Sequence, residues 1–337
     1  MNKSLLTLGG TLFICACAPP PAPIEVVETT IAQVQDAITS GQTTCRMVVQ
    51  SYLDRIEAYD QPTGMNAITV VNPNALARAD EIDEAVGNGD ELGSLFCAPL
   101  LIKDNYDTYD LPTTGGSIAL KESIPPDDAF MVQKLREADA IVLAKTNMAE
   151  WAFSPRQTIS SSYGTTANAY ALDRVPAGSS GGTASGVAAS FGVAGMGTDT
   201  GNSIRGPSSH LALFGIRSTI GLTSRDGVIP LSFQSDIAGP MARTVEDAAR
   251  IFNVVAGYDP ADPYTEEGRG RKADDYTAFL DAQGLAGARI GVLRELVNTD
   301  DADAEVIEVF EQALEDLRRL GAEILDPLEI APLQELR

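Results

Sequence analysis

The stretch that decides the fold runs from Gly178 to Pro207 and reads GSSGGTASGVAASFGVAGMGTDTGNSIRGP. It places two serines in glycine-rich turns, Ser179 in GSSGG and Ser203 in GTDTGNSIRGP. Glycine adopts positive φ at little cost, so such a backbone can approach a ligand closely. A serine hydroxyl held in a turn of this kind is exposed, and nearby N–H groups can point at one oxygen. The stretch therefore predicts a serine nucleophile beside an oxyanion hole.

A lysine follows a short apolar run earlier in the chain. The run Pro99-Leu100-Leu101-Ile102 ends in Lys103-Asp104-Asn105. Burying a lysine at the end of such a strand is costly unless the residue has a task. The chain has one histidine, which nearly excludes a Ser-His-Asp triad and leaves a Ser-Ser-Lys arrangement. Considered alone, a lysine is more often exposed at the surface, and a serine in such a turn more often has no catalytic role. The prediction therefore depends on the joint pattern of Lys103, Ser179 and Ser203.

These segments together resemble the amidase signature family. Its pattern is a strand ending in Lys-Asp-Asn, then GSSGG, then TD-x-GGSIR-x-P, and the chain has all three in this order. The resemblance extends over roughly residues 30 to 260 and includes four further phrases. They are LPTTGGS (111–117), AKTNMAEWAFS (144–154), SSYGTTANAYALDRVPAGSSGG (161–182) and GLTSRDGVIPLSFQSDIAGPMARTVEDAA (221–249).

The resemblance implies a catalytic relay. A neutral Lys103 takes a proton from Ser179, Ser179 takes one from Ser203, and Ser203 attacks an amide carbonyl. In the family the bridging serine follows a cis peptide bond. The backbone N–H groups from Thr200 to Ser203, through Gly201 and Asn202, form the implied oxyanion hole. No cofactor and no metal ion are implied.

The nucleophile loop departs from the family pattern at one position. The family has Gly-Gly-Ser where this chain has Gly201-Asn202-Ser203. Asparagine is the non-glycine residue that best tolerates positive φ, and it adds an amide side chain near the reaction centre. Asp199 and Arg205 are expected to shape this loop, and His210 is expected to be a helix residue, neither base nor ligand.

The alternation of strands, turns and helices predicts an α/β fold. The resemblance specifies a mixed central sheet with helices on both faces, as one amidase signature domain over residues 30–337. Family members are usually longer, so the C-terminal part of the domain is expected to be missing. We expect helices at 31–39, 43–59, 74–86, 128–138, 183–190, 207–215 and 303–320, strands at 97–102, 141–144, 192–197, 289–293 and 322–325, and a surface excursion at 259–275.

The composition excludes one class of partner. The 337 residues are 44% hydrophobic and carry a formal net charge of −23. Phosphate binding needs clustered Lys and Arg, so no nucleic-acid partner is expected. The expected partner is a small-molecule amide.

The first residues read as an export signal. Lys3 is followed by apolar or small residues up to position 16, too few to span a bilayer. Ile14-Cys15-Ala16-Cys17 fits a bacterial lipoprotein box, which would lipidate Cys17, and residues 17–29 then form a Pro-rich tether. Ala18 indicates the outer membrane of a Gram-negative host. The expected location is therefore periplasmic, with membrane attachment only through the lipid; an ordinary signal peptide cut near Ala16 or Ala18 is the alternative.

Two cysteines lie beyond this signal, Cys45 and Cys97. In an exported protein such a pair permits a disulfide, and two separate buried thiols are the alternative. The sequence alone leaves both open, because it does not give the geometry.

The leading functional hypothesis is an exported amidase that forms an acyl-Ser203 intermediate. One alternative is the glutaminase component of a tRNA-dependent amidotransferase, which belongs to the same family but works in the cytoplasm. Another is an amidase-like binding protein whose catalysis is impaired. A dinucleotide-binding domain is disfavoured, because no G-x-G-x-x-G follows a first strand.

Overall fold

The structure, a computed structural model, describes residues 20–331. The export signal predicted over residues 1–16 and the lipidation site Cys17 lie outside the described residues. Where one domain was expected, the chain divides into two compact units, of which the first ends at Asp274 and the second begins at Asp275. The division falls at the end of the polar stretch 259–275, which has few apolar side chains to bury.

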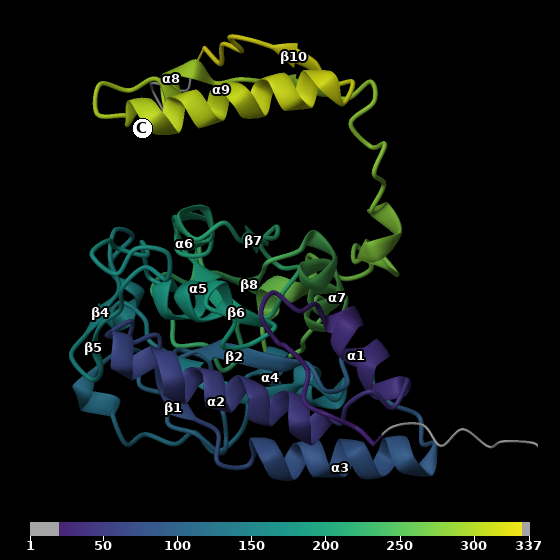
Figure 1. The fold of residues 1–337 in the computed structure, drawn as a ribbon. Coiled ribbons are helices and arrows are strands. Elements are labelled where there is room, and N and C mark those ends of the chain that lie inside the picture. Colours follow the sequence, from purple (N-terminus) through teal and green to yellow (C-terminus); the bar gives the residue numbers. More distant parts are fainter. Residues whose placement is uncertain (1–19, 332–337) are drawn as a thin grey trace, which may run out of the picture. The chain divides into compact units, whose positions relative to one another are not determined.

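A six-stranded mixed sheet forms the centre of the larger unit, with the order β1-β3-β2-β6-β8-β7 (Figure 1). Strand β2 is parallel to β3 and β6, whereas β1, β8 and β7 pair antiparallel to their neighbours. This confirms the predicted mixed α/β sheet. The strands are β1 (Ile68–Val71), β2 (Pro99–Lys103), β3 (Ile141–Thr146), β6 (Ala194–Asp199), β7 (Phe214–Gly215) and β8 (Ile237–Ala242); β4 (Ile159–Ser160) and β5 (Gly164–Thr165) form a separate antiparallel pair.

Helices pack around this sheet. Helix α5 contacts β2, β6 and β8, α3 and α4 contact β3, and α7 contacts β8. In Figure 1, α5 lies above the central strands and α3 lies below them. The α-helices of this unit are α1 (Ile31–Thr39), α2 (Cys45–Thr63), α3 (Ala75–Asn88), α4 (Phe130–Glu137), α5 (Gly181–Ala188), α6 (Arg205–His210) and α7 (Val245–Val255), with 3₁₀ turns η1 (Ile118–Leu120), η2 (Glu150–Ala152) and η3 (Pro263–Glu266).

Helix α5 lies unusually close to the sheet because its residues are small. A Cβ atom on Gly186 would stand 2.7 Å from Leu101 Cδ1, and one on Gly195 of β6 would stand 2.6 Å from Thr183 Cγ2. Neither position has room for a side chain. This close packing brings the residues just before α5, Ser179 and Ser180, to the ends of the central strands.

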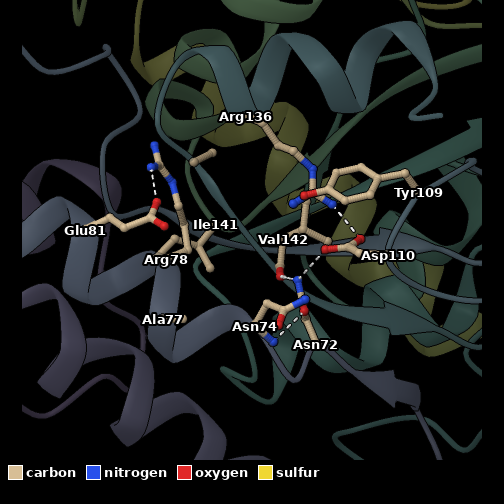
Figure 2. A pocket seen from close by; sticks show the side chains of 11 residues that line it. Asn72, Asn74, Ala77, Arg78, Glu81, Tyr109, Asp110, Arg136, Ile141 and Val142 are labelled. Atoms are coloured by element: carbon tan, nitrogen blue, oxygen red, sulfur yellow. Dashed lines mark hydrogen bonds and ion pairs between the residues drawn. The ribbon is translucent and has the colours of Figure 1, made fainter.

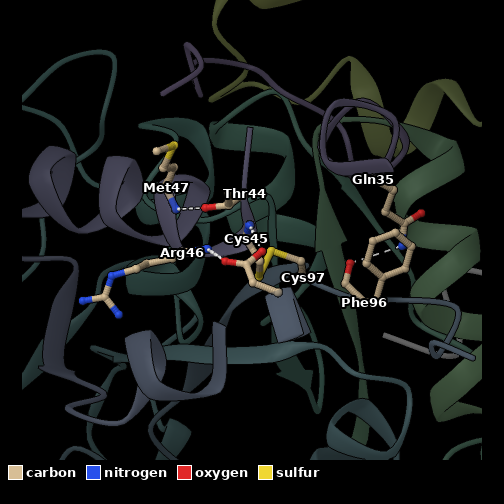
Figure 3. The surroundings of a disulfide bond; sticks show 8 residues. Gln35, Thr44, Cys45, Arg46, Met47, Phe96 and Cys97 are labelled. Atoms are coloured by element: carbon tan, nitrogen blue, oxygen red, sulfur yellow. Dashed lines mark hydrogen bonds between the residues drawn. A yellow bond between two sulfur atoms is a disulfide. The ribbon is translucent and has the colours of Figure 1, made fainter. Parts of the chain in front are cut away.

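A disulfide joins Cys45, the first residue of α2, to Cys97, two residues before β2 (Figure 3). Both cysteines are fully buried, and their Cα atoms are 5.7 Å apart. Beside them, the Gln35 side chain of α1 donates a hydrogen bond to the Phe96 carbonyl. Of the two alternatives left open by the sequence, the structure contains the disulfide, which ties α2 to the strand that carries Lys103.

The helix expected over residues 207–215 is wrong. Helix α6 begins before Pro207, because the Asp199 carboxylate accepts the N–H groups of Ile204 and Arg205 at the start of the helix. The helix ends at His210. Residues 214–215 form β7, which pairs with β8. Strands β1 and β8 and helix α7 were not predicted, since the expected elements left residues 60–73 and 216–258 without assignment.

Residues 22–29 of the predicted tether pack on the domain. Val26 is buried, and the Glu28 N–H donates to Ser190 Oγ at 3.0 Å. The Ala22 N–H donates to the Gln42 carbonyl, and the Thr29 carbonyl accepts from Arg243 Nη2. These residues are therefore held against the larger unit.

The smaller unit contains two parallel strands, β9 (Arg289–Gly291) and β10 (Glu323–Leu325), joined through α8 (Arg294–Val297) and α9 (Ala304–Arg319), and a turn η4 (Tyr276–Phe279). This is the predicted strand–helix–strand order. Arg294 pairs with Glu311 and Asp326 and so links α9 to the end of β10. Over residues 20–331, no helix has the length and apolar character that a bilayer crossing requires.

Candidate active site

Two parallel strands end at the same edge of the sheet and carry polar residues there. Lys103 is the last residue of β2, and Thr198 and Asp199 are the last of β6. Because carboxyl ends of parallel strands meet at one edge, the register Ile102↔Met196 brings Lys103 beside Thr198. The turn before α5 adds Ser179 at the same place.

The Lys103 ammonium position is fixed by two hydroxyl groups. Its Nζ lies 2.7 Å from Ser179 Oγ and 2.7 Å from Thr198 Oγ1. Asn105 Nδ2 also donates to Thr198 Oγ1, at 3.2 Å. Lys103 and Ser179 are fully buried. The structure thus brings together Lys103 and Ser179, as the relay requires. Thr198 was not among the predicted site residues, although it lies in the quoted GTDTGNSIRGP segment.

Burial lowers the pKa of Lys103 from its ordinary value to about 7, although the nearby carboxylates of Asp199 and Asp236 act in the opposite direction. Desolvation penalises the charged ammonium, and the two hydroxyl contacts do not replace the lost water. Near neutral pH a large share of Lys103 is therefore the neutral amine, which can accept a proton.

The GSSGG turn is attached to β6 and to the segment that follows β3. The Gly178–Ser179 peptide bond is cis. The Ser179 carbonyl accepts from the Ala149 N–H at 3.0 Å. Ser180 Oγ accepts from the Thr198 N–H at 3.3 Å and donates to the Thr198 carbonyl at 3.2 Å. These bonds hold the turn against the end of β6 and aim the Ser179 hydroxyl at Lys103.

Asp199 holds the nucleophile loop in shape. Its Oδ2 accepts the N–H groups of Ile204 (3.1 Å) and Arg205 (3.2 Å), and both Arg205 and Arg217 pair with the carboxylate. Burial raises the pKa of Asp199, but the hydrogen bonds from Arg205 and the two N–H groups outweigh it, so the pKa lies below its ordinary value. Asp199 and Arg205 thus shape the loop around Ser203, as expected.

Ser203 lies two residues before the start of α6 and is 5% exposed. Its hydroxyl has no hydrogen bond within residues 20–331, and it is not bonded to Ser179. In the same part of the chain, the N–H groups of Gly201, Asn202 and Ser203 donate to no protein acceptor. A carbonyl oxygen at this loop would therefore meet donors that no protein group already uses.

Asn202 does not rely on positive φ. Neither Gly201 nor Asn202 has a positive φ angle, so the tolerance argued from the sequence is not needed here. The Asn202 side chain is half-buried, and its Nδ2 donates to the Pro155 carbonyl at 3.4 Å. It also covers Gly206, where a Cβ atom would stand 2.1 Å from Nδ2. His210 is the last residue of α6, as expected of a helix residue.

A second buried lysine stands one strand away. Lys145 of β3 donates to the Tyr106 carbonyl (2.6 Å) and Thr113 Oγ1 (2.7 Å), and its Nζ is 3.9 Å from Asp104 Oδ1. Burial lowers the pKa of Lys145 to about 8, against the opposing effect of Asp104 and other carboxylates. Asp104 in turn accepts from the Thr114 N–H at 3.2 Å. Lys145 and Asp104 together hold the segment that follows β2. The sequence signal for Lys145 was its position directly after the apolar run 141–144.

A cavity of about 440 Å³ lies at the other end of the sheet, at the start of β3 (Figure 2). Its charged side chains are already paired: Arg136 with Asp110, and Arg78 with Glu81. Figure 2 shows these two pairs on opposite sides of the cavity. The relay residues do not line it, so this cavity and the candidate active site are separate.

Comparison with known proteins gives the family. A family model described as Amidase matches residues 47–336. A curated relative from Microcystis aeruginosa, the A subunit of glutamyl-tRNA(Gln) amidotransferase, is 38% identical over 88% of this chain and 60% of its own length. The native peptide amidase from Stenotrophomonas maltophilia is 41% identical with a TM-score of 0.84, over 91% of this chain and 63% of that chain.

A third match is the A subunit of glutamyl-tRNA(Gln) amidotransferase from Thermotoga maritima, 30% identical with a TM-score of 0.79 over 93% of this chain and 64% of that chain. The chain spans about 60% of the length of the curated relatives it matches. The family match covers most of the chain, and the GSSGG turn and, apart from Asn202, the nucleophile loop follow the family pattern. The chain belongs to the amidase signature family.

Proposed function

We propose that this protein hydrolyses the C–N bond of a small carboxamide through an acyl-Ser203 intermediate. The observation that carries the proposal is the 2.7 Å contact between Lys103 Nζ and Ser179 Oγ in a fully buried setting. Among residues 20–331 no carboxylate is bonded to this Nζ, so at neutral pH the amine is available as a base.

The proposed reaction moves protons along the three side chains. Neutral Lys103 accepts the Ser179 proton as Ser179 accepts the Ser203 proton, and Ser203 Oγ forms a bond to the carbonyl carbon. The oxyanion is stabilised by the loop N–H groups, one of which contributes about 10²–10³ in rate. Collapse expels the amine, which takes the proton back through Ser179. Water then releases the acid by the same path. Ser203 must turn its hydroxyl toward Ser179 for this relay.

The test uses a fluorophosphonate probe and an amide panel. The panel includes peptide C-terminal amides, because a peptide amidase is among the most similar solved structures, and free glutamine. We expect labelling of Ser203 and hydrolysis of at least one amide, both lost in Ser203→Ala, while Ser179→Ala retains more activity because a water can take the place of its hydroxyl. Labelling of Ser203→Ala at the rate of the unaltered protein would contradict the assignment.

A second candidate is the glutaminase component of a tRNA-dependent amidotransferase. It is favoured by the names of the curated relatives, which are amidotransferase A subunits. Hydrolysis of glutamine alone in the panel would favour this candidate. If neither labelling nor hydrolysis occurs, the protein is an amidase-like binding protein.

Export and lipidation of Cys17 remain part of the proposal. They are supported by the lipoprotein box at residues 14–17 and by the buried Cys45–Cys97 disulfide, since disulfides persist mainly in oxidising compartments. Mass spectrometry of the N-terminal peptide should find a lipid on Cys17 in a membrane fraction. An unmodified N-terminus after Ala16 or Ala18 would exclude the anchor.

A further inference from the structure

Asp236 stands directly before β8 and joins two loops at the candidate active site. Its Oδ1 accepts a 2.5 Å hydrogen bond from the hydroxyl of Thr200, the first residue of the predicted oxyanion loop. Its Oδ2 accepts the N–H groups of Leu231 and Ser232, both at 2.8 Å. Asp236 is 9% exposed. One carboxylate therefore attaches the segment 231–236 to the strand end that leads to Ser203.

The segment that Asp236 belongs to is itself held in place. The Arg225 guanidinium donates to the Phe233 carbonyl and pairs with Asp262 at 2.9 Å. Arg217 donates to the Ser235 carbonyl at 3.2 Å. Because Arg225 and Arg217 hold this segment, the position of the Asp236 carboxylate does not depend on its hydrogen bond with Thr200.

Asp236 also lies near the base, because it lines one small pocket together with Thr198, whose hydroxyl is 2.7 Å from Lys103 Nζ. The charged groups that act on Lys103 are the carboxylates of Asp199 and Asp236. Asp199 is neutralised by Arg205 and Arg217, whereas Asp236 forms no salt bridge anywhere in residues 20–331. Asp104, which follows β2, pairs with Lys145 of β3, so these two charges offset each other. The charge of Asp236 contributes to raising the pKa of Arg225, but the salt bridge of Arg225 is with Asp262.

We propose that Asp236 is a positioning residue of this active site, which fixes the oxyanion loop through Thr200 and directs negative charge at Lys103. The expected effect on kcat rests on the proposed amidase function. The effect of the Asp236 charge on the titration of Lys103, which we call the charge effect, can be measured without turnover. The two effects separate by substitution, because Thr200→Val removes only the hydroxyl bond and Asp236→Asn removes the charge.

The experiment combines kinetics with a lysine titration. In protein labelled with ¹³Cε-lysine, the Lys103 resonance is assigned by its absence in Lys103→Met and followed against pH. We expect Asp236→Asn to lower the pH at which Lys103 titrates by about one unit. Thr200→Val should leave that pH unchanged and lower kcat by about tenfold, since the loop donors lose their alignment. The control Asp262→Asn loosens the same segment through Arg225 and should leave the titration in place.

Two results would overturn the inference. Titration of Lys103 in Asp236→Asn at the pH of the unaltered protein would refute the charge effect. An unaltered kcat in Thr200→Val would refute the positioning effect. If Asp236→Asn does not fold, Asp236→Ser supplies the neutral variant. If the unaltered protein hydrolyses no amide, the proposed function fails, whereas the lysine titration still decides the charge effect.

Discussion

Replacing Lys103 with methionine should stabilise the protein while abolishing its activity. Methionine fills a similar volume but carries no charge to desolvate. Unfolding moves the pKa of Lys103 from about 7 in the native protein to its ordinary value of 10.5. Each unit of that difference is about 1.4 kcal/mol, so the native state carries a penalty on the order of 5 kcal/mol from this side chain at low pH.

The penalty depends on pH in a definite direction. Below pH 7 Lys103 is protonated in both states, and the full cost of burying the ammonium applies. Between pH 7 and 10.5 the unfolded chain binds a proton that the native protein lacks, so stability rises with pH and the penalty fades. Against this, methionine loses the contacts with Ser179 and Thr198, each contributing about 1 kcal/mol. The net gain is therefore about 2–3 kcal/mol at pH 6.

The assay is urea unfolding of the two proteins at pH 6 and pH 10. Lys103→Met should be more stable than the unaltered protein at pH 6, and the advantage should shrink or reverse at pH 10. Lys134→Met, which changes a lysine with about a third of its side chain exposed, is the control and should show no such difference between the two pH values. A variant that is equally destabilised at both pH values would refute the reasoning, because burial would then not penalise the charge.

Three further outcomes are expected. Activity should fall below pH 7 as Lys103 gains a proton, by about 100-fold at pH 5, which a pH profile of kcat/KM measures. Lys103→Arg should stay inactive at every pH, because arginine remains protonated. Replacing Cys45 and Cys97 by serine should lower the free energy of unfolding by about 2–5 kcal/mol, since the disulfide closes a loop of 52 residues; an unchanged urea midpoint under oxidising conditions would argue against the bond.

The relay residues could be proposed from the sequence because they sit in short segments with fixed spacing. Lys103 follows an apolar run, and each serine stands in a glycine-rich turn, so the local pattern carried the assignment. The strands 97–102, 141–144 and 192–197 were found for the same reason, since buried parallel strands read as short apolar runs. Strand β8 was not found, because IAGPMA contains glycine and proline and has no clear period.

The contacts that tune the site were beyond a reading of local patterns. Thr198 and Asp236 stand 95 and 133 positions after Lys103, and only the β2–β6–β8 pairing brings their strands together. Asp236 lies in the quoted phrase 221–249, but its sequence does not show that its carboxylate reaches Thr200. Likewise the early start of α6 follows from Asp199, which lies outside the helix and accepts its first N–H groups.

Two opposing effects set the protonation of Lys103, and the structure assigns them to different residues. Burial among β2, β6 and the GSSGG turn favours the neutral amine, whereas Asp199 and Asp236 favour the ammonium. Full burial without the carboxylates would make the amine a weaker base, because its proton would leave too readily. The carboxylates without burial would keep it charged and unable to accept a proton. A lysine base that works near neutral pH therefore needs both, and Asp236, which forms no salt bridge within residues 20–331, supplies part of the negative charge that favours the ammonium.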